Sequence, residues 1–262
     1  MRSKRTQSVE KRPNDPEAWY LQGVAALEAG RIDGAVHAFL RAVELAPDGC
    51  EHALAAAAQL SRTGARREGE LILRRALTRF PARPELRDGL VLLLIDDGRE
   101  RVALAEATIA LRADPEAISL RLLAATAYER LGQADNAIEQ LSSITARLPT
   151  HVEANRRLGT LLAETGDFAG ALHCWRQVVA QRGAADHEAL TTLGRQLSAA
   201  GEHREALRIL YDVAAMKPAL ASAHANLGMA LLASGHVQEA VRSFRRILEL
   251  DAAWPSRDAV SS

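Results

Sequence analysis

Aromatic residues are scarce in this 262-residue chain, at 4% of the sequence, whereas alanine is abundant. Sandwiches and barrels rely on aromatic and β-branched residues, so this composition favours closely packed helices. No apolar run approaches the roughly 20 residues that a membrane-spanning helix needs. The first ten residues carry charges without an apolar core, which excludes a secretory signal. We therefore expect an all-α protein located in the cytoplasm, without membrane insertion.

An excess of charge is also missing, because 33 basic residues balance 33 acidic ones. A dedicated nucleic-acid-binding protein usually carries a basic excess, so we expect no nucleic acid partner. Neither Cys50 nor Cys174 belongs to a C-x-x-C pair, and the eight histidines lack the spacing of metal ligands. Nucleophile motifs and phosphate-binding loops are absent. The sequence therefore predicts no cofactor, no metal site, no catalytic residue and no enzyme activity.

Seven glycines recur at a nearly constant spacing of 34 residues, with one step of 35. They are Gly30, Gly64, Gly98, Gly132, Gly166, Gly201 and Gly235. A fixed period of this length indicates stacked repeats. After a basic leader over residues 1–15, and before a short polar tail over 255–262, the chain divides into seven units: 16–49, 50–83, 84–117, 118–151, 152–185, 187–220 and 221–254.

Each unit shows the three-and-four spacing of two amphipathic helices, with the recurring glycine between them. Glycine can adopt the left-handed conformation that ends a helix and lets the chain reverse. Counted from the start of a unit, positions 8 and 20 are mostly small and position 24 is mostly large. Small side chains would let the two helix backbones approach, and the large one would fill the space beside them. At the first helix, Asp15 is a capping residue and Pro16 suits the first turn.

The residues at these positions resemble the tetratricopeptide repeat pattern W-x-x-L-G-x-x-Y, A-x-x-x-F, P. The first unit carries Trp19-x-x-Gln22-Gly23-x-x-Ala26, then Ala35-x-x-x-Phe39 and Pro47. Leu193-Gly194 and Leu227-Gly228 match the L-G part directly. The resemblance covers about nine-tenths of the chain. It implies a right-handed α-solenoid of stacked antiparallel helix pairs, in which each repeat packs on its neighbours.

Two places depart from the regular pattern. The junction around residues 181–187 lacks the proline found in other units and carries the extra residue Asp186. It is either a hinge or a longer turn, and we favour the turn because loops tolerate single insertions well. At the other place, the last helix, near 236–251, would leave Val241 and Leu248 uncovered. Trp254 folds back over that face, or the chain continues, or the face meets another copy in a homo-oligomer.

The resemblance also implies that positions 2, 5, 6, 9, 12 and 13 of each unit line a concave groove. These positions are mostly apolar and acidic in the first four units and more basic or neutral polar in the last three. The candidate partner-binding residues are Tyr20, Val24, Leu54, Asp88, Leu92 and Leu122, followed by Arg156, Arg157, Thr160, Thr192, Arg195 and Asn226. Because arginine binds carboxylates through a fork of donors, a peptide with an acidic segment and an apolar anchor would fit.

Two well-known subtypes of the family do not match. The clamp that holds a chaperone C-terminus needs Lys, Asn, Asn, Lys and Arg at the positions where this chain has Arg156, Thr160, Thr192, Ser222 and Asn226. The asparagine ladder of the O-linked N-acetylglucosamine transferase family has asparagine at position 6 of successive units, and in this chain only Asn226 stands there. The sequence therefore predicts a non-enzymatic scaffold that binds a protein or peptide in its concave groove. Two alternatives stay open: the recruiting domain of a larger transferase, and an assembly factor for a cell-envelope or secretion complex.

Overall fold

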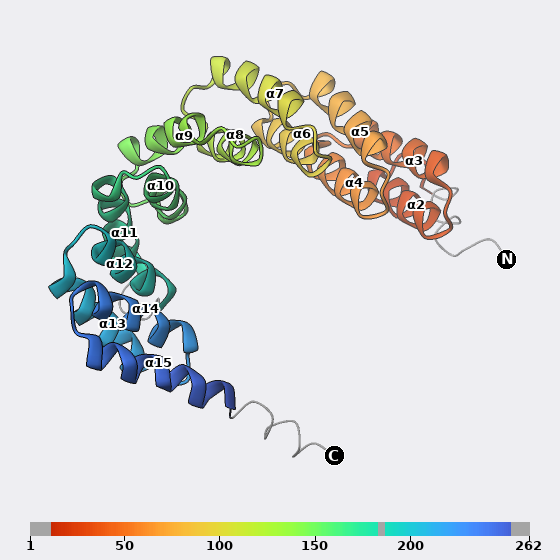
Figure 1. The fold of residues 1–262 in the computed structure, drawn as a ribbon. Coiled ribbons are helices and arrows are strands. Elements are labelled where there is room, and N and C mark those ends of the chain that lie inside the picture. The colour runs from red at the N-terminus through yellow and green to blue at the C-terminus, as the bar shows by residue number, and fades with distance from the viewer. Residues whose placement is uncertain (1–11, 183–186, 253–262) are drawn as a thin grey trace, which may run out of the picture. The chain divides into compact units, whose positions relative to one another are not determined.

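The computed structural model describes residues 12–182 and 187–252, and helices joined by short turns account for nearly all of them (Figure 1). The first helices of successive pairs are α2 (Pro16–Glu28), α4 (Cys50–Arg62), α6 (Pro84–Asp96), α8 (Ile118–Arg130), α10 (Val152–Glu164), α12 (His187–Ala199) and α14 (Ala221–Ala233). The second helices are α3 (Ile32–Leu45), α5 (Arg66–Arg79), α7 (Glu100–Ala113), α9 (Ala134–Arg147), α11 (Phe168–Arg182), α13 (His203–Met216) and α15 (Val237–Ala252). No strand occurs in the described residues, so the predicted all-α helical-repeat fold is confirmed.

Each first helix begins at the residue that opens one of the seven predicted units. At the start of α2, a side-chain oxygen of Asp15 accepts a hydrogen bond from the Glu17 backbone N–H at 3.1 Å, and Pro16 occupies the first turn. The carboxylate thereby satisfies a backbone donor that has no partner inside the helix. The predicted cap is confirmed.

All seven recurring glycines have positive φ angles, from 69° at Gly30 to 90° at Gly166. Around Gly98, the glycine N–H donates to the Ile95 carbonyl at 3.1 Å, and the Arg99 N–H donates to the Leu94 carbonyl at 2.9 Å. These bonds satisfy the last carbonyls of α6, and they form because the glycine takes the left-handed conformation. The glycines therefore end the first helices, as the sequence predicted.

Replacing Gly98 by alanine is expected to destabilise the fold by about 1–2 kcal/mol, because a Cβ is costly in the left-handed region. The cost is one of backbone conformation, since apart from the glycine and its two chain neighbours no heavy atom lies within 4 Å of the position that the Cβ would occupy. Gly34 is the matched control. It lies inside α3, where a Cβ would meet only ordinary contacts at 3.9 Å, so alanine there should stabilise by about 0.5 kcal/mol. Urea unfolding would measure both, and equal effects at the two sites would contradict the assignment.

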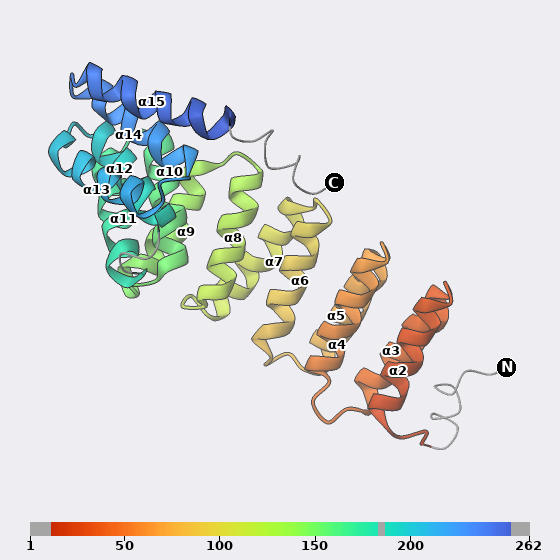
Figure 2. The same cartoon turned by 90° about the horizontal axis from the view of Figure 1, so that it is seen from below.

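The chain separates into two compact units, residues 1–140 and 141–262, and the boundary falls inside α9. In the first unit α2 contacts α4, α4 contacts α6, and α6 contacts α8, so the first helices form one layer. Figure 2 shows the pairs α2–α3, α4–α5 and α6–α7 following one another within this unit. In the second unit α10 packs on α11, α12 on α13 and α14 on α15, and α12 also contacts α14. Residues 183–186 and Trp254 lie outside the described residues, so the predictions made for them stand untested.

The interior of at least four pairs follows the predicted size rule. A Cβ built on Gly194 would lie 2.7 Å from Leu210 Cγ, and one on Gly228 would lie 2.7 Å from the Phe244 ring. The same relation joins Gly23 to Phe39 and Gly159 to Trp175. Position 8 must therefore be small because the side chain at position 24 of the same pair fills the space next to it. At these distances the van der Waals radii of the Cβ and the neighbouring side-chain atoms would overlap.

Candidate functional site

For each unit we call the surface of its first helices the first-helix face, and the candidate groove residues of the first unit lie there. The Tyr20 ring packs against Phe39, with ring centroids 5.5 Å apart, and against His52 at 6.0 Å. Val24 and Leu54 are half-buried against the same core. Leu122 is half-buried on α8, and Leu92 on α6 is 48% exposed. Most of the predicted apolar residues therefore support the packing of the helices, and Leu92 is the most open of them.

Asp88 lies on α6 in the same face, and its environment is unfavourable for a charged carboxylate. Burial raises the pKa of Asp88; a hydrogen bond with Ser119 opposes that rise, and the nearby Glu85 adds to it. The Oδ1 atom is buried and has no hydrogen-bond partner among the described residues. Among the described residues that shift the pKa of this carboxyl, only Ser119 favours the ionised form, and none is a cation.

Asp88 and Glu70 should affect stability with opposite signs. Glu70 on α5 is also partly buried, but hydrogen bonds from Arg99 and Arg74 overcome that burial and lower the pKa of its carboxyl. Asp88 contributes fully to the free energy of unfolding below its unfolded-state pKa of about 4, where it is protonated. This contribution is lost as the pH rises through the raised pKa that Asp88 has in the folded protein. The stability linked to Glu70 is present above its unfolded pKa and is lost as the pH falls through its lowered value.

We therefore expect Asp88→Asn to raise the melting temperature at pH 7, and Glu70→Gln to lower it by a few degrees. Both differences from the wild type should shrink towards pH 3. Thermal unfolding of the wild type and both variants, followed by circular dichroism at pH 7 and pH 3, measures these differences in melting temperature. A lower melting temperature for Asp88→Asn at pH 7 would show that the ionised carboxylate is stabilised by a contact not described above.

The basic residues of the second unit are less free than their sequence suggests. The Arg156 guanidinium pairs with the Glu153 carboxylate at 2.9 Å on the same helix, α10. The Thr160 hydroxyl donates to the Arg156 carbonyl at 3.0 Å, and the Asn226 amide donates to the Ser222 carbonyl at 2.8 Å. These two side chains therefore already use one of their donors within their own helices.

Arg195 on α12 is the exception among the predicted arginines. It is exposed and makes no ion pair with any described residue. Arg157 and Thr192 are half-buried, and Arg157 has contacts of its own. The most available positive charge on the first-helix face of the second unit is therefore that of Arg195.

Two apolar residues of α14 extend this face beyond the predicted list. Met229 is 62% exposed and Leu232 is 43% exposed, although both belong to a well-packed helix. Both occupy positions that the repeat pattern assigns to the groove, and Met229 stands at position 9, as Arg195 does in the preceding unit. Both positions belong to the stripe that the family resemblance assigns to the groove, so these apolar side chains were visible in the sequence, whereas their exposure was not.

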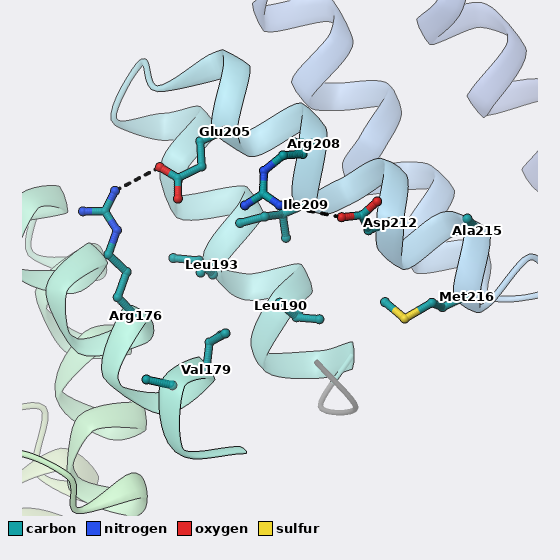
Figure 3. A pocket seen from close by; sticks show the side chains of 11 residues that line it. Arg176, Val179, Leu190, Leu193, Glu205, Arg208, Ile209, Asp212, Ala215 and Met216 are labelled. Carbon is teal, nitrogen blue, oxygen red and sulfur yellow. Dashed lines mark hydrogen bonds and ion pairs between the residues drawn. The ribbon is translucent and has the colours of Figure 1, made fainter. Parts of the chain in front are cut away.

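A pocket of ≈ 640 Å³ lies elsewhere in the second unit, between α11, α12 and α13 (Figure 3). Its inner wall is apolar, and four charged side chains stand at its rim, among them Arg176, whose guanidinium reaches Glu205 at 3.1 Å. The lining residues are Arg176, Val179, Ala180, Leu190, Leu193, Glu205, Arg208, Ile209, Asp212, Ala215 and Met216. None of the predicted site residues lines it, so this pocket is separate from the first-helix face.

The described residues offer little to a metal ion or a membrane. Within 12–182 and 187–252, no three His, Cys, Asp or Glu side chains gather as metal ligands would. None of the helices in these ranges combines the length and apolarity needed to cross a membrane. Cys50 and Cys174 are buried free thiols, and burial raises the pKa of Cys174 to about 11. A thiol with so high a pKa carries almost no reactive thiolate at neutral pH.

Several solved structures share this fold. MamA from Desulfovibrio magneticus aligns with a TM-score of 0.58 at 20% identity, over 64% of this chain and 95% of that one. A second MamA structure aligns with a TM-score of 0.56 at 24% identity, over 62% and 95% of the two chains. A tetratricopeptide repeat protein from Parabacteroides merdae gives 0.58 at 18% identity, over 76% and 79%. At these identities the similarity is one of fold.

Sequence profiles agree with the helix pairs. Three profiles described as tetratricopeptide repeat match the chain, and the second of them alone covers more than half of it. They match residues 50–152 in the first case, 6–49, 122–186 and 156–219 in the second, and 197–258 in the third. Together with the positive-φ glycines and the packing of position 8 on position 24, these matches place the chain in the tetratricopeptide repeat family.

Proposed function

We propose that this protein is a non-enzymatic scaffold that binds a protein or peptide partner on the first-helix faces of its units, the faces that the family resemblance makes concave. Helical repeats of this kind present extended faces for partner binding. The observation that carries the proposal is the exposure of large apolar side chains on well-packed helices of this face: Leu92 at 48% and Met229 at 62%. On the sequence alone, we propose the cytoplasm as its location.

The chemistry of the partner follows from the second unit. Arg195 and Met229 occupy the same position of successive first helices, α12 and α14, which are in contact. The face thus offers a free guanidinium next to an exposed apolar side chain. A carboxylate in the partner can pair with the guanidinium through two hydrogen bonds, and an adjacent apolar residue can cover Met229 and Leu232. An acidic segment with an apolar anchor meets both requirements.

Reversing two charges on this face should weaken binding. We expect Arg156→Glu with Arg195→Glu to reduce the captured amount of the main partner at least tenfold, because a carboxylate would then face like charge. Isotope-labelled affinity capture followed by mass spectrometry measures the amount. The matched control, Arg204→Glu with Lys217→Glu, makes the same change in charge at exposed sites off the face and should capture as the wild type does. Equal capture by both variants, at unchanged helicity, would contradict the proposal.

We also propose that the protein self-associates through α15. Leu248 is 69% exposed and Val241 is 41% exposed, on the side where a further repeat would pack. An apolar helix face of this kind is stabilised when another helix covers it. Self-association would be seen as an average mass that rises with protein concentration.

A further inference from the structure

The exposed apolar edge of α15 includes two positions, those of Val241 and Leu248, that are buried in some other repeats. Val237, Val241 and Leu248 are 53%, 41% and 69% exposed, and we call them the α15 ridge. The residue equivalent to Leu248 in the preceding repeat is Ala214, which is 8% exposed, and the residue equivalent to Val241 in the fifth repeat is Leu172, at 4%. The ridge therefore has the character of a helix-packing face that no helix among the described residues covers.

The pocket between α11, α12 and α13 is an incomplete packing surface in the same unit, and we call it the α11–α13 groove. Leu190 and Leu193 of α12 lie across it from Ile209 of α13, and Met216 stands at one end with 43% of its surface exposed (Figure 3). Its volume of ≈ 640 Å³ is enough for several apolar side chains. A groove with apolar walls between two helices is a common receptor for an amphipathic helix.

The lengths of the ridge and the groove match. On α13 the lining residues run from Glu205 to Met216, and on α15 the ridge runs from Val237 to Leu248. Each stretch spans eleven residue steps, or about 16 Å along a helix at 1.5 Å per residue. The apolar side chains of the ridge can therefore lie along the α13 wall of the groove.

The charges also match. At the groove, Arg176 pairs with both Glu202 at 3.2 Å and Glu205 at 3.1 Å, while Asp212 has only Arg208, at 3.9 Å. Glu202 lies outside the groove, whose lining carries two guanidinium groups and two carboxylates, and Asp212, with its one partner at 3.9 Å, is the lining carboxylate most open to a further cation. Beside the ridge, Arg242 and Arg245 are exposed and make no ion pair with the described residues. Their positive charges would meet the carboxylates at the rim.

We propose that the α15 ridge of one copy inserts into the α11–α13 groove of a second copy. This inference rests on the self-association proposed above and names the surface that receives α15. The contact joins two different surfaces, so each copy has one of each and the assembly grows into open chains or rings. The interface is small, so the association is weak and depends on concentration.

Complementary variants test this pairing. Leu248→Glu disables the ridge and Ala180→Trp fills the groove; both positions are exposed, so the fold should persist. In sedimentation velocity we expect the wild type to grow beyond a dimer with concentration, and each variant alone to stay monomeric. An equimolar mixture should form a complex of two copies and no larger one, because one intact ridge meets one intact groove. Leu148→Glu and Ala169→Trp, exposed sites outside both surfaces, are the controls and should associate as the wild type does.

The possible failures differ from one another. If Leu248→Glu abolishes association and Ala180→Trp leaves it intact, self-association through α15 stands and the groove is not its receptor. A mixture that stays monomeric when each variant is monomeric also overturns the pairing. A wild type that is monomeric at all concentrations overturns both proposals, and this is the result expected if another part of the same chain covers the ridge.

Discussion

Replacing Gly194 by valine is expected to destabilise the second unit by about 3 kcal/mol, because a Cβ at this position would lie 2.7 Å from Leu210 Cγ. Leu210 is fully buried and cannot move away without disturbing its neighbours. Leu210→Ala alone should also cost about 3 kcal/mol, since it leaves a cavity in the same place. At about 4 °C per kcal/mol, each variant should melt roughly 12 °C below the wild type.

The double variant should recover much of this loss. The double variant places valine at position 8 and alanine at position 24. The third repeat already has this combination in Val91 and Ala107, both 1% exposed. We expect Gly194→Val with Leu210→Ala to be at least about 2 kcal/mol more stable than the sum of the single effects predicts. Urea unfolding of the four proteins measures this coupling. Purely additive losses would show that the two positions do not share one space.

Trp175→Ala should have a second large effect, confined to one unit. Trp175 is 3% exposed and belongs to the core that includes Leu172, Val178 and Leu193. Removing a buried tryptophan side chain costs about 3–5 kcal/mol through lost burial and the cavity that remains. Phe39, fully buried, belongs to the separate core of the first unit. We therefore expect Trp175→Ala to reduce protection in residues 141–262, and Phe39→Ala to reduce it in residues 1–140.

Hydrogen exchange followed by mass spectrometry reports the two regions separately. Trp175→Phe is a useful companion variant, because the Trp175 Nε1 atom is buried without a partner among the described residues. Phenylalanine removes that unsatisfied donor while it keeps most of the ring, so it should cost less than alanine. Equal loss of protection over both regions for Trp175→Ala would contradict the division into two units.

The repeated features were predictable because they depend on residues within one helix pair. Gly30 and its equivalents end the first helices through their own backbone conformation. Gly23 is small because Phe39, sixteen positions later in the same repeat, occupies the adjacent space. Such short-range relations appear in the sequence as a period. The all-α fold and the starts of the first helices followed from them.

Other features depend on details that no period encodes. Arg156 was predicted as a partner-binding residue, and its pairing with Glu153, one turn away on the same helix, was not foreseen. The α11–α13 groove results from the summed volumes of side chains on three helices, among them Val179, Leu190 and Ile209. The division of the chain falls inside α9, where the repeat pattern continues without change. Each of these outcomes required atomic positions.

Site-specific photo-crosslinking tests most directly whether partners bind along the first-helix face. A benzoylphenylalanine at Thr160, which is exposed on α10, would probe that face, and one at His173, exposed on α11 of the same repeat, would probe the second helices. We expect a crosslinked partner from Thr160, and we expect Arg156→Glu with Arg195→Glu to abolish it. A partner that crosslinks to His173 and not to Thr160 would contradict the proposed binding face.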